Sequence, residues 1–79
     1  MEIDWKTAPW WAQWFAIDED GTGWWYATKP VVNRANGLWQ IDEKQNQWGF
    51  QLAGHQGDDF GDWEQSVLQR PIGGTNDKA

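Results

Sequence analysis

The sequence predicts a small all-β fold, either an antiparallel meander or an open barrel of four to five short strands. Short runs rich in aromatic and β-branched residues recur at roughly ten-residue spacing, and Asp, Asn, Gly and Pro separate them. No stretch shows the sustained 3.6-residue apolar period of a long helix. We expect one small β domain over residues 1–71 and a flexible, polar tail over residues 72–79.

The first predicted element is a β-hairpin over residues 10–29, in which aromatic runs flank Asp20-Gly21. Asp-Gly favours a two-residue type I′ turn, which would place Ala16 opposite Trp25. Pro30 ends the return strand because it cannot donate to a ladder. Both faces of this hairpin are apolar, so it is either covered on both sides or has one aromatic face that serves as a contact surface.

The later elements follow from turns and alternation. Asn36-Gly37 predicts a turn, and residues 38–42 a strand after it. Alternation of apolar with small or polar residues predicts a half-buried strand at 48–52, followed by a loop over 53–62. Residues 63–68 fit a last strand, which we favour, or one short helix.

Tryptophan is the main functional clue in the composition, with nine Trp among 79 residues and no Cys. Large rings can build a core from few residues, and five aromatics are the core candidates: Phe15, Trp24, Trp39, Trp48 and Phe50. Nine Trp exceed what one small core encloses, and exposed Trp is typical of binding hot spots. Four hairpin residues are the candidates for an exposed contact surface: Trp10, Trp11, Trp14 and Trp25.

The net charge of −6, from 12 acidic and six basic residues, limits the classes of partner. It argues against sequence-independent nucleic-acid binding and against docking on anionic lipid. No apolar run reaches the length of a membrane span, and no signal-peptide pattern opens the chain, so an intracellular location is expected. Asp18, Glu19 and Asp20 would form an acidic rim beside the aromatic surface, which predicts a protein partner with a basic rim. The acids are too sparse for a regular mimic of DNA.

Groups for catalysis or metal binding are few. Ser66 is the only Ser and His55 the only His, and no nucleophile-elbow motif surrounds Ser66. Asp58, Asp59 and Asp62 lack the spacing of an EF-hand loop and fit turn chemistry instead. We therefore expect no enzymatic activity, no cofactor and no metal site.

The spacing of Trp and turn residues resembles that of small Trp-rich proteins encoded by tailed bacteriophages and prophages. The resemblance spans residues 3–71 and rests on these segments: Asp4-Trp5, Ala8-Pro9, Trp14-Phe15-Ala16, Asp20-Gly21, Trp24-Trp25-Tyr26, Lys29-Pro30, Gly37-Leu38-Trp39, Trp63, Ser66 and Arg70-Pro71. That group has no assigned chemistry. The resemblance implies a setting, the cytoplasm of an infected bacterium, and no active site.

Two further resemblances are shorter. Trp14, Gly23-Trp24-Trp25-Tyr26 and Trp39 are similar to the aromatic pattern of WW domains, although Gln40-Ile41-Asp42 stands where those domains have a closing Pro. Residues 23–27, Pro30 and residues 37–39 also resemble small chitin-binding modules.

The expected function is that of a non-enzymatic phage accessory protein. It would bind a host or phage protein through the aromatic, acid-rimmed surface, with inhibition as one consequence. A carbohydrate-binding module that stacks Trp rings on sugars and a WW-like binder of Pro-rich peptides remain alternatives. Pairing of two aromatic faces in a homodimer is a further one.

Overall fold

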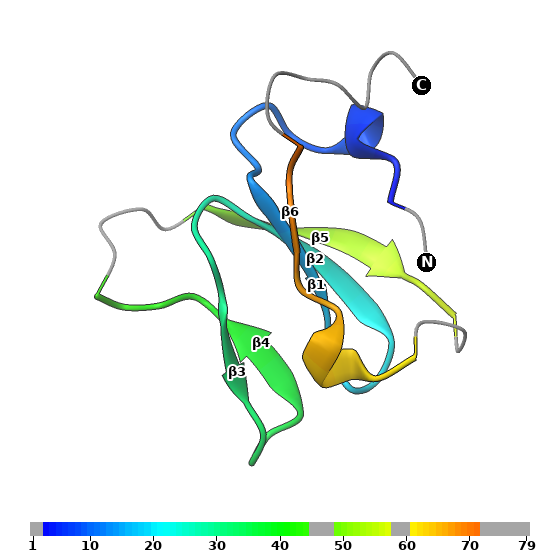
Figure 1. The fold of residues 1–79 in the computed structure, drawn as a ribbon, viewed down its shortest axis with the longest axis vertical. Coiled ribbons are helices and arrows are strands. Elements are labelled where there is room, and N and C mark those ends of the chain that lie inside the picture. Colours follow the sequence, from blue (N-terminus) through cyan, green and yellow to red (C-terminus); the bar gives the residue numbers. More distant parts are fainter. Residues whose placement is uncertain (1–2, 45–48, 58–60, 72–79) are drawn as a thin grey trace.

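The computed structural model describes residues 3–44, 49–57 and 61–71. In this part of the chain there are six strands and two single-turn 3-10 helices: η1 (Trp5–Thr7), β1 (Trp14–Ile17), β2 (Thr22–Tyr26), β3 (Val31–Asn33), β4 (Leu38–Gln40), β5 (Phe50–His55), η2 (Trp63–Gln65) and β6 (Leu68–Gln69). Four strands form an antiparallel sheet in the order β5-β2-β1-β6, and β3 and β4 form a separate hairpin (Figure 1). The predicted small all-β fold is confirmed. The strand order departs from a simple meander, because β2 pairs with β5 instead of β3.

The β1–β2 hairpin forms where it was predicted, but its register is shifted by one residue. Phe15, and not Ala16, lies opposite Trp25. The Asp18 N–H donates to the Thr22 carbonyl at 2.9 Å, which leaves a loop of three residues, 19–21, instead of two. Gly21 alone in this loop has positive φ (+91°), whereas a type I′ turn needs positive φ at both central residues. The predicted type I′ turn and its pairings are therefore wrong.

One side of the four-stranded sheet, which carries Phe15, Ile17 and Trp25, is here named the closed face. These three side chains are buried together with Trp5 of η1 and Ala12. The Trp25 ring lies 5.2 Å from that of Trp5 and 5.1 Å from that of Phe15, between ring centroids. The segment before β1 therefore covers this face with an aromatic cluster.

Arg70 holds that N-terminal segment against the end of β6. Its Nη1 donates to the carbonyls of Ala12 at 2.8 Å and Pro9 at 3.2 Å, and its backbone N–H to that of Gln13 at 2.7 Å. Its guanidinium carbon lies 5.7 Å from the centroid of the Trp5 ring. These contacts hold the segment before β1, which covers the closed face, in place.

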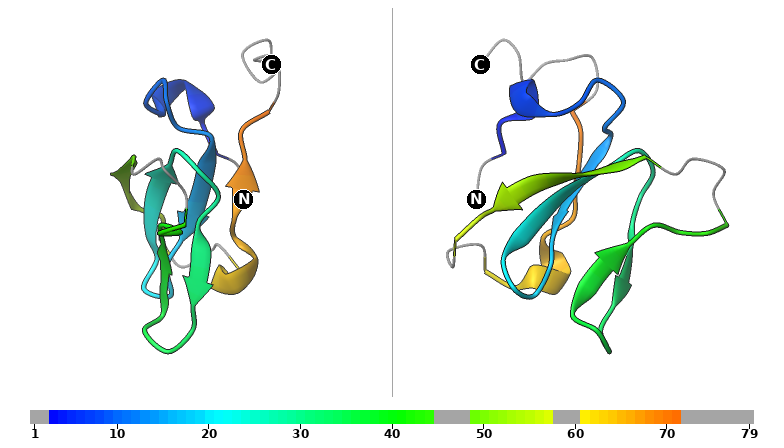
Figure 2. Two further views of the ribbon diagram at one scale, coloured as in Figure 1. Left: turned by 90° about the vertical axis from the view of Figure 1, so that its left-hand side faces the viewer. Right: turned by 180° about the vertical axis from the view of Figure 1, so that it is seen from behind.

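The other side of the sheet, which carries Ala16, Trp24 and Tyr26, is here named the groove face. The β3–β4 hairpin packs on it, and its turn has Gly37 at a φ of +71°, as the Asn36-Gly37 signal predicts. Figures 1 and 2 show this hairpin beside η2, at the opposite end of the molecule from η1. Ala16 and Tyr26 are buried together with Trp39 of β4.

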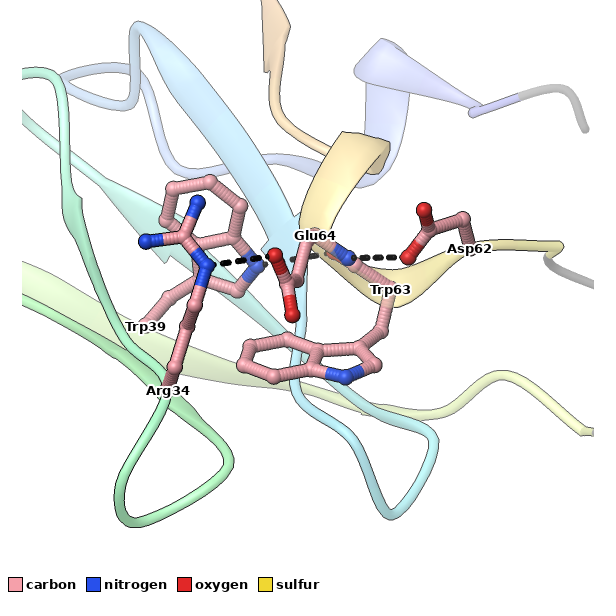
Figure 3. Close-up of polar contacts among 5 residues, drawn as sticks. All are labelled: Arg34, Trp39, Asp62, Trp63 and Glu64. Carbon is pink, nitrogen blue, oxygen red and sulfur yellow. Dashed lines mark hydrogen bonds and ion pairs between the residues drawn. The ribbon is translucent and has the colours of Figure 1, made fainter.

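The hairpin is anchored to η2 by two side-chain contacts (Figure 3). The Trp39 indole N–H donates to the Trp63 carbonyl at 3.1 Å. Arg34 Nε lies 2.7 Å from Glu64 Oε1 in an ion pair. Both contacts join the hairpin to the β1–β6 side of the sheet, since the Ser66 hydroxyl that follows η2 bonds to Ile17 of β1.

Three sequence-based boundaries need correction. The favoured strand at 63–68 is wrong, since Asp62 caps the short helix η2 by accepting the Glu64 N–H at 3.1 Å, and only Leu68–Gln69 is extended. The predicted strand 38–42 is shorter, as β4 ends at Gln40, and it pairs with an unpredicted β3. The predicted loop 53–62 begins later, because β5 continues through His55. The expected tail and the start of the 48–52 strand lie outside the described residues.

Candidate binding groove

A cavity of about 250 Å³ opens on the groove face, between β2 and the β4 strand of the hairpin. Nearly all of its lining is aromatic or aliphatic, and these apolar residues are Trp24, Tyr26, Leu38, Trp39, Ile41 and Phe50. The hairpin forms one wall because it packs toward β1 and η2. No described segment covers the β5 side of this face, where Phe50 and Leu52 are exposed.

Strand register explains why these apolar side chains lie together. Tyr26 pairs with Phe50 and Trp24 with Leu52, and directly paired residues point to the same side of a sheet. The Trp24 and Phe50 rings lie 6.0 Å apart between centroids. Phe50 is 53% exposed and Leu52 is 55% exposed, so the rim of the groove on β5 is apolar and open to solvent.

Polar groups inside the groove are bonded and fix its shape. The Tyr26 hydroxyl donates to the Trp39 carbonyl at 3.1 Å, and the Asp18 carboxylate accepts the Trp39 N–H at 2.7 Å. The backbone C=O and N–H of Trp39 therefore both bond to the β1–β2 hairpin, and these two bonds hold β4 against the sheet. No buried side-chain N or O atom in the described part of the chain lacks a partner.

Asp18 lies at one end of the groove and is buried. Burial raises its pKa above the ordinary value, and the Asp20 carboxylate also raises it, while hydrogen bonds from the Trp39 backbone and the Trp24 side chain act in the opposite direction. Burial, with the nearby Asp18 charge, strongly raises the pKa of Tyr26, so this phenol stays a neutral hydrogen-bond donor. The groove thus has one acidic residue, Asp18, and Gln40 is the other residue of its lining outside the apolar set.

The four Trp residues predicted to form one exposed surface lie in different places. Trp10 is 87% exposed in the turn before β1, and Trp11 is half-buried on the closed face. Trp14 is half-buried on the groove face, with Lys29 Nζ 5.6 Å from its ring centroid. Trp25 is only 5% exposed, so the expectation that its ring is a contact surface is wrong. The one-residue shift in register is the cause, because it turns Trp25 toward Phe15.

The three acidic residues predicted to form a rim also differ in burial. Asp18 is buried at the groove end, and Glu19 and Asp20 are exposed in the adjoining turn. Asp20 accepts the Thr22 N–H at 2.9 Å, and this bond lowers its pKa. Only the last two are therefore free to meet a partner at the surface.

Sequence reasoning missed the exposure of β5. Phe50 was predicted to be core and is instead half-exposed, whereas Phe15 and Trp39 are buried as predicted. Trp24 is partly buried in the groove, and Trp48 lies outside the described residues. The one available signal was that Phe50-Gln51-Leu52 alternates like a strand with only one covered face, but alternation does not say which face is covered.

The potential catalytic side chains have structural partners. The Ser66 hydroxyl accepts the Ile17 N–H at 2.9 Å and lies within hydrogen-bond distance of two backbone carbonyls, while His55 Nδ1 accepts the Gly57 N–H at 3.1 Å. Ser66 contacts β1 and His55 lies on β5, with β2 between these strands. Within residues 3–44, 49–57 and 61–71, no three acidic or His side chains gather as metal ligands would. No helix in those same segments is long and apolar enough to cross a membrane.

Comparison with known protein families, with curated proteins and with solved structures gives no match to this chain.

Proposed function

We propose that this protein is a non-enzymatic binding module that takes up apolar side chains of a partner protein in the groove between β2, β5 and β4. One observation carries the proposal: an aromatic groove stays open beside two half-exposed apolar side chains, Phe50 and Leu52. Apolar surface left open next to a well-packed core is typical of interaction sites. The phage setting of the binding comes from the sequence resemblance alone.

The size of the groove favours side chains over a separate small ligand. Its volume of about 250 Å³ is below the range of roughly 300–1,000 Å³ that is usual for small-molecule pockets. An apolar side chain presented by another protein fits such a space, and the exposed Phe50 and Leu52 would extend the contact beyond it. The acidic end at Asp18, with Glu19 and Asp20 beyond it, favours a partner with basic residues at its rim.

The proposal is tested by comparing the proteins that purified, immobilised variants retain from a bacterial lysate. The groove variant carries Phe50→Gln and Leu52→Gln, which remove exposed apolar groups without touching the buried core. The matched control is Val31→Gln, which changes an exposed apolar residue of β3 outside the groove lining. We expect a protein that wild type and the control retain and the groove variant loses, with all three folded by circular dichroism.

A third variant, Trp10→Gln, identifies the competing site. Trp10 is the most exposed large apolar residue of the described chain, and it lies in the segment that covers the closed face. A partner that is lost with Trp10→Gln and kept by the groove variant would contradict the groove and place binding at that ring.

A further inference from the structure

The outer edge of β5 carries backbone groups that no other strand of the described chain pairs with. In the described part of the chain β5 ends the four-stranded sheet, with β2 on one side and no strand on the other. The Ala27 N–H donates to the Gly49 carbonyl at 2.9 Å, so the backbone of Gly49 faces β2. Hydrogen-bonding direction alternates along an antiparallel strand, so Gln51 also faces β2, while the N–H and C=O of Phe50 and Leu52 point outward.

From Phe50 to Leu52 this edge lacks two of the protections that edge strands usually have, charge and Pro. Natural sheets protect their edges with short strands, charged residues, Pro or β-bulges. The other edge strand, β6, has two residues and is soon followed by Arg70-Pro71. β5 has six residues, and its register with β2 shifts between Leu52 and Gly54, so the regular part of the edge is Phe50 to Leu52, which contains neither a charged residue nor Pro. Its outward backbone groups also belong to Phe50 and Leu52, whose side chains form the apolar rim of the groove.

The charges around the edge select the kind of strand that would pair with it. Thr22 pairs with His55, so the turn with exposed Glu19 and Asp20 adjoins one end of β5. Asp42 and Glu43 directly follow the groove residue Ile41. The single ion pair in the described part of the chain, Arg34–Glu64, involves none of these four acids. A net charge of −6 disfavours a second copy of the chain as the occupant, because like charges would meet.

We infer that the partner binds as an extended segment that adds a strand to the outer edge of β5. Its backbone pairs with Phe50 and Leu52, and its alternate apolar side chains stand beside their side chains on the groove face. A Lys or Arg of the segment lies near Glu19 and Asp20. This inference rests on the proposed function, since it states how the partner of the groove is held.

The first test selects peptides from a displayed random eight-residue library on the immobilised full-length protein, and then compares the binding of the selected peptides to wild type and to the Phe50→Gln/Leu52→Gln variant. We expect enriched sequences with apolar residues at alternate positions and a Lys or Arg near one end. Enrichment of Pro-rich sequences, or of helical spacing, would overturn strand addition and leave the groove as the binding site. Enriched peptides that the groove variant binds equally well, or no enrichment at all, would overturn both.

The second test removes backbone donors while keeping side chains. The best selected peptide is compared with a version N-methylated at the positions that face β5. We expect the N-methylated peptide to bind at least about fivefold more weakly, since each ladder hydrogen bond contributes about 1 kcal/mol. Amide hydrogen exchange of Phe50 and Leu52 should slow at least about tenfold on binding of the unmodified peptide. Equal affinity of the two peptides, or unchanged exchange at both amides, would overturn the inference.

A protein variant gives the same information from the other side of the interface. Leu52→Pro removes an outward N–H that β2 does not use, and Leu52→Ala is its control because both lose the Leu side chain. We expect the Pro variant to bind the peptide more weakly than the Ala variant, and the wild type and both variants to be monomeric in light scattering. A wild-type dimer that Leu52→Pro dissociates would overturn the inference in favour of a second copy. If Leu52→Pro does not fold, the N-methylated peptide decides.

Discussion

The two faces of the four-stranded sheet are built from the same kind of residue and end in different states. On the closed face, the Trp25 ring lies 5.2 Å from the Trp5 ring and 5.1 Å from the Phe15 ring between centroids, and all three side chains are buried. On the groove face, the hairpin covers the β1 side and leaves Phe50 and Leu52 half-exposed. An aromatic sheet face therefore becomes closed core or partly open surface according to which segment covers it, and five predictions test that contrast.

The largest effect is expected from Trp25→Ala on the closed face. Removing a large ring from a core that cannot fill the space costs about 3–5 kcal/mol of unfolding free energy. Urea denaturation followed by circular dichroism measures it, and a variant that is already unfolded without urea agrees with the expectation. A loss below about 1 kcal/mol would show that this face is not the stabilising one.

The next largest effect is expected from Ser66→Ala. This change removes the hydrogen bond that joins the end of η2, on which the β3–β4 hairpin is anchored, to β1. The change leaves the buried Ile17 N–H without its acceptor, at a cost of about 1–3 kcal/mol. Amide exchange should quicken around η2 and Trp39 before it does on the closed face. Gln65→Ala, an exposed neighbour, serves as the control and should stay within about 0.5 kcal/mol of wild type. Equal stability of the two variants would contradict the assigned bond.

Phe50→Ala should cost much less than Trp25→Ala, below about 1 kcal/mol, because only about half of this side chain is buried. The same urea denaturation measures both variants. A cost as large as that of Trp25→Ala would mean that the groove rim is part of the core, and would remove the contrast between the faces.

The pH dependence of stability should separate Asp18 from Asp20. The pKa of Asp18 is raised above 3.8 in the folded state, so that state binds more protons than the unfolded one in the range from about pH 3.8 up to the raised pKa. Stability from this group therefore falls as pH rises through that range. Asp18→Asn should gain stability relative to wild type over the same range and keep the gain at higher pH.

Asp20 serves as a control, because its pKa is shifted in the opposite direction and its contribution to stability should change with pH in the opposite sense. Its pKa is lowered by the Thr22 hydrogen bonds, so its contribution is present above pH 3.8 and is lost as pH falls through the lowered pKa. Asp20→Asn should accordingly lose stability relative to wild type at neutral pH, and the difference should shrink in acid. Difference curves of the same sign for the two variants would contradict the burial of Asp18.

The smallest effect is expected from the Arg34–Glu64 ion pair. The Arg34 side chain is 69% exposed, and exposed pairs contribute about 0.2–1 kcal/mol at most. A double-mutant cycle of Arg34→Ala and Glu64→Ala should give a coupling in that range that decreases with salt. A larger coupling that salt does not reduce would mean that this pair, more than Trp39 and Ser66, anchors the hairpin.

The residues that carry the phage resemblance mostly stabilise the fold. Trp5 and Trp25 form the closed core, Ser66 bonds to Ile17, and Arg70 holds the N-terminal segment. They therefore explain why such a pattern would be shared without indicating a partner. Within the groove, the exposed rim residues Phe50 and Leu52 lie outside that pattern, whereas four lining residues belong to it: Trp24, Tyr26, Leu38 and Trp39.

Local patterns in the sequence determined the fold class, the hairpin over residues 10–29 and the turns at Gly21 and Gly37, because alternation and positive φ depend on neighbours along the chain. They did not determine register, since Asp-Gly suits both two- and three-residue loops and one residue of slip exchanges the faces. Only the tertiary structure decided that Trp25 is core and Phe50 is rim. Which segment covers a sheet face, and which strands are neighbours, depend on contacts between segments that are distant in the sequence. Here these are the contacts of η1 with β2 and of β2 with β5, which no local pattern encodes.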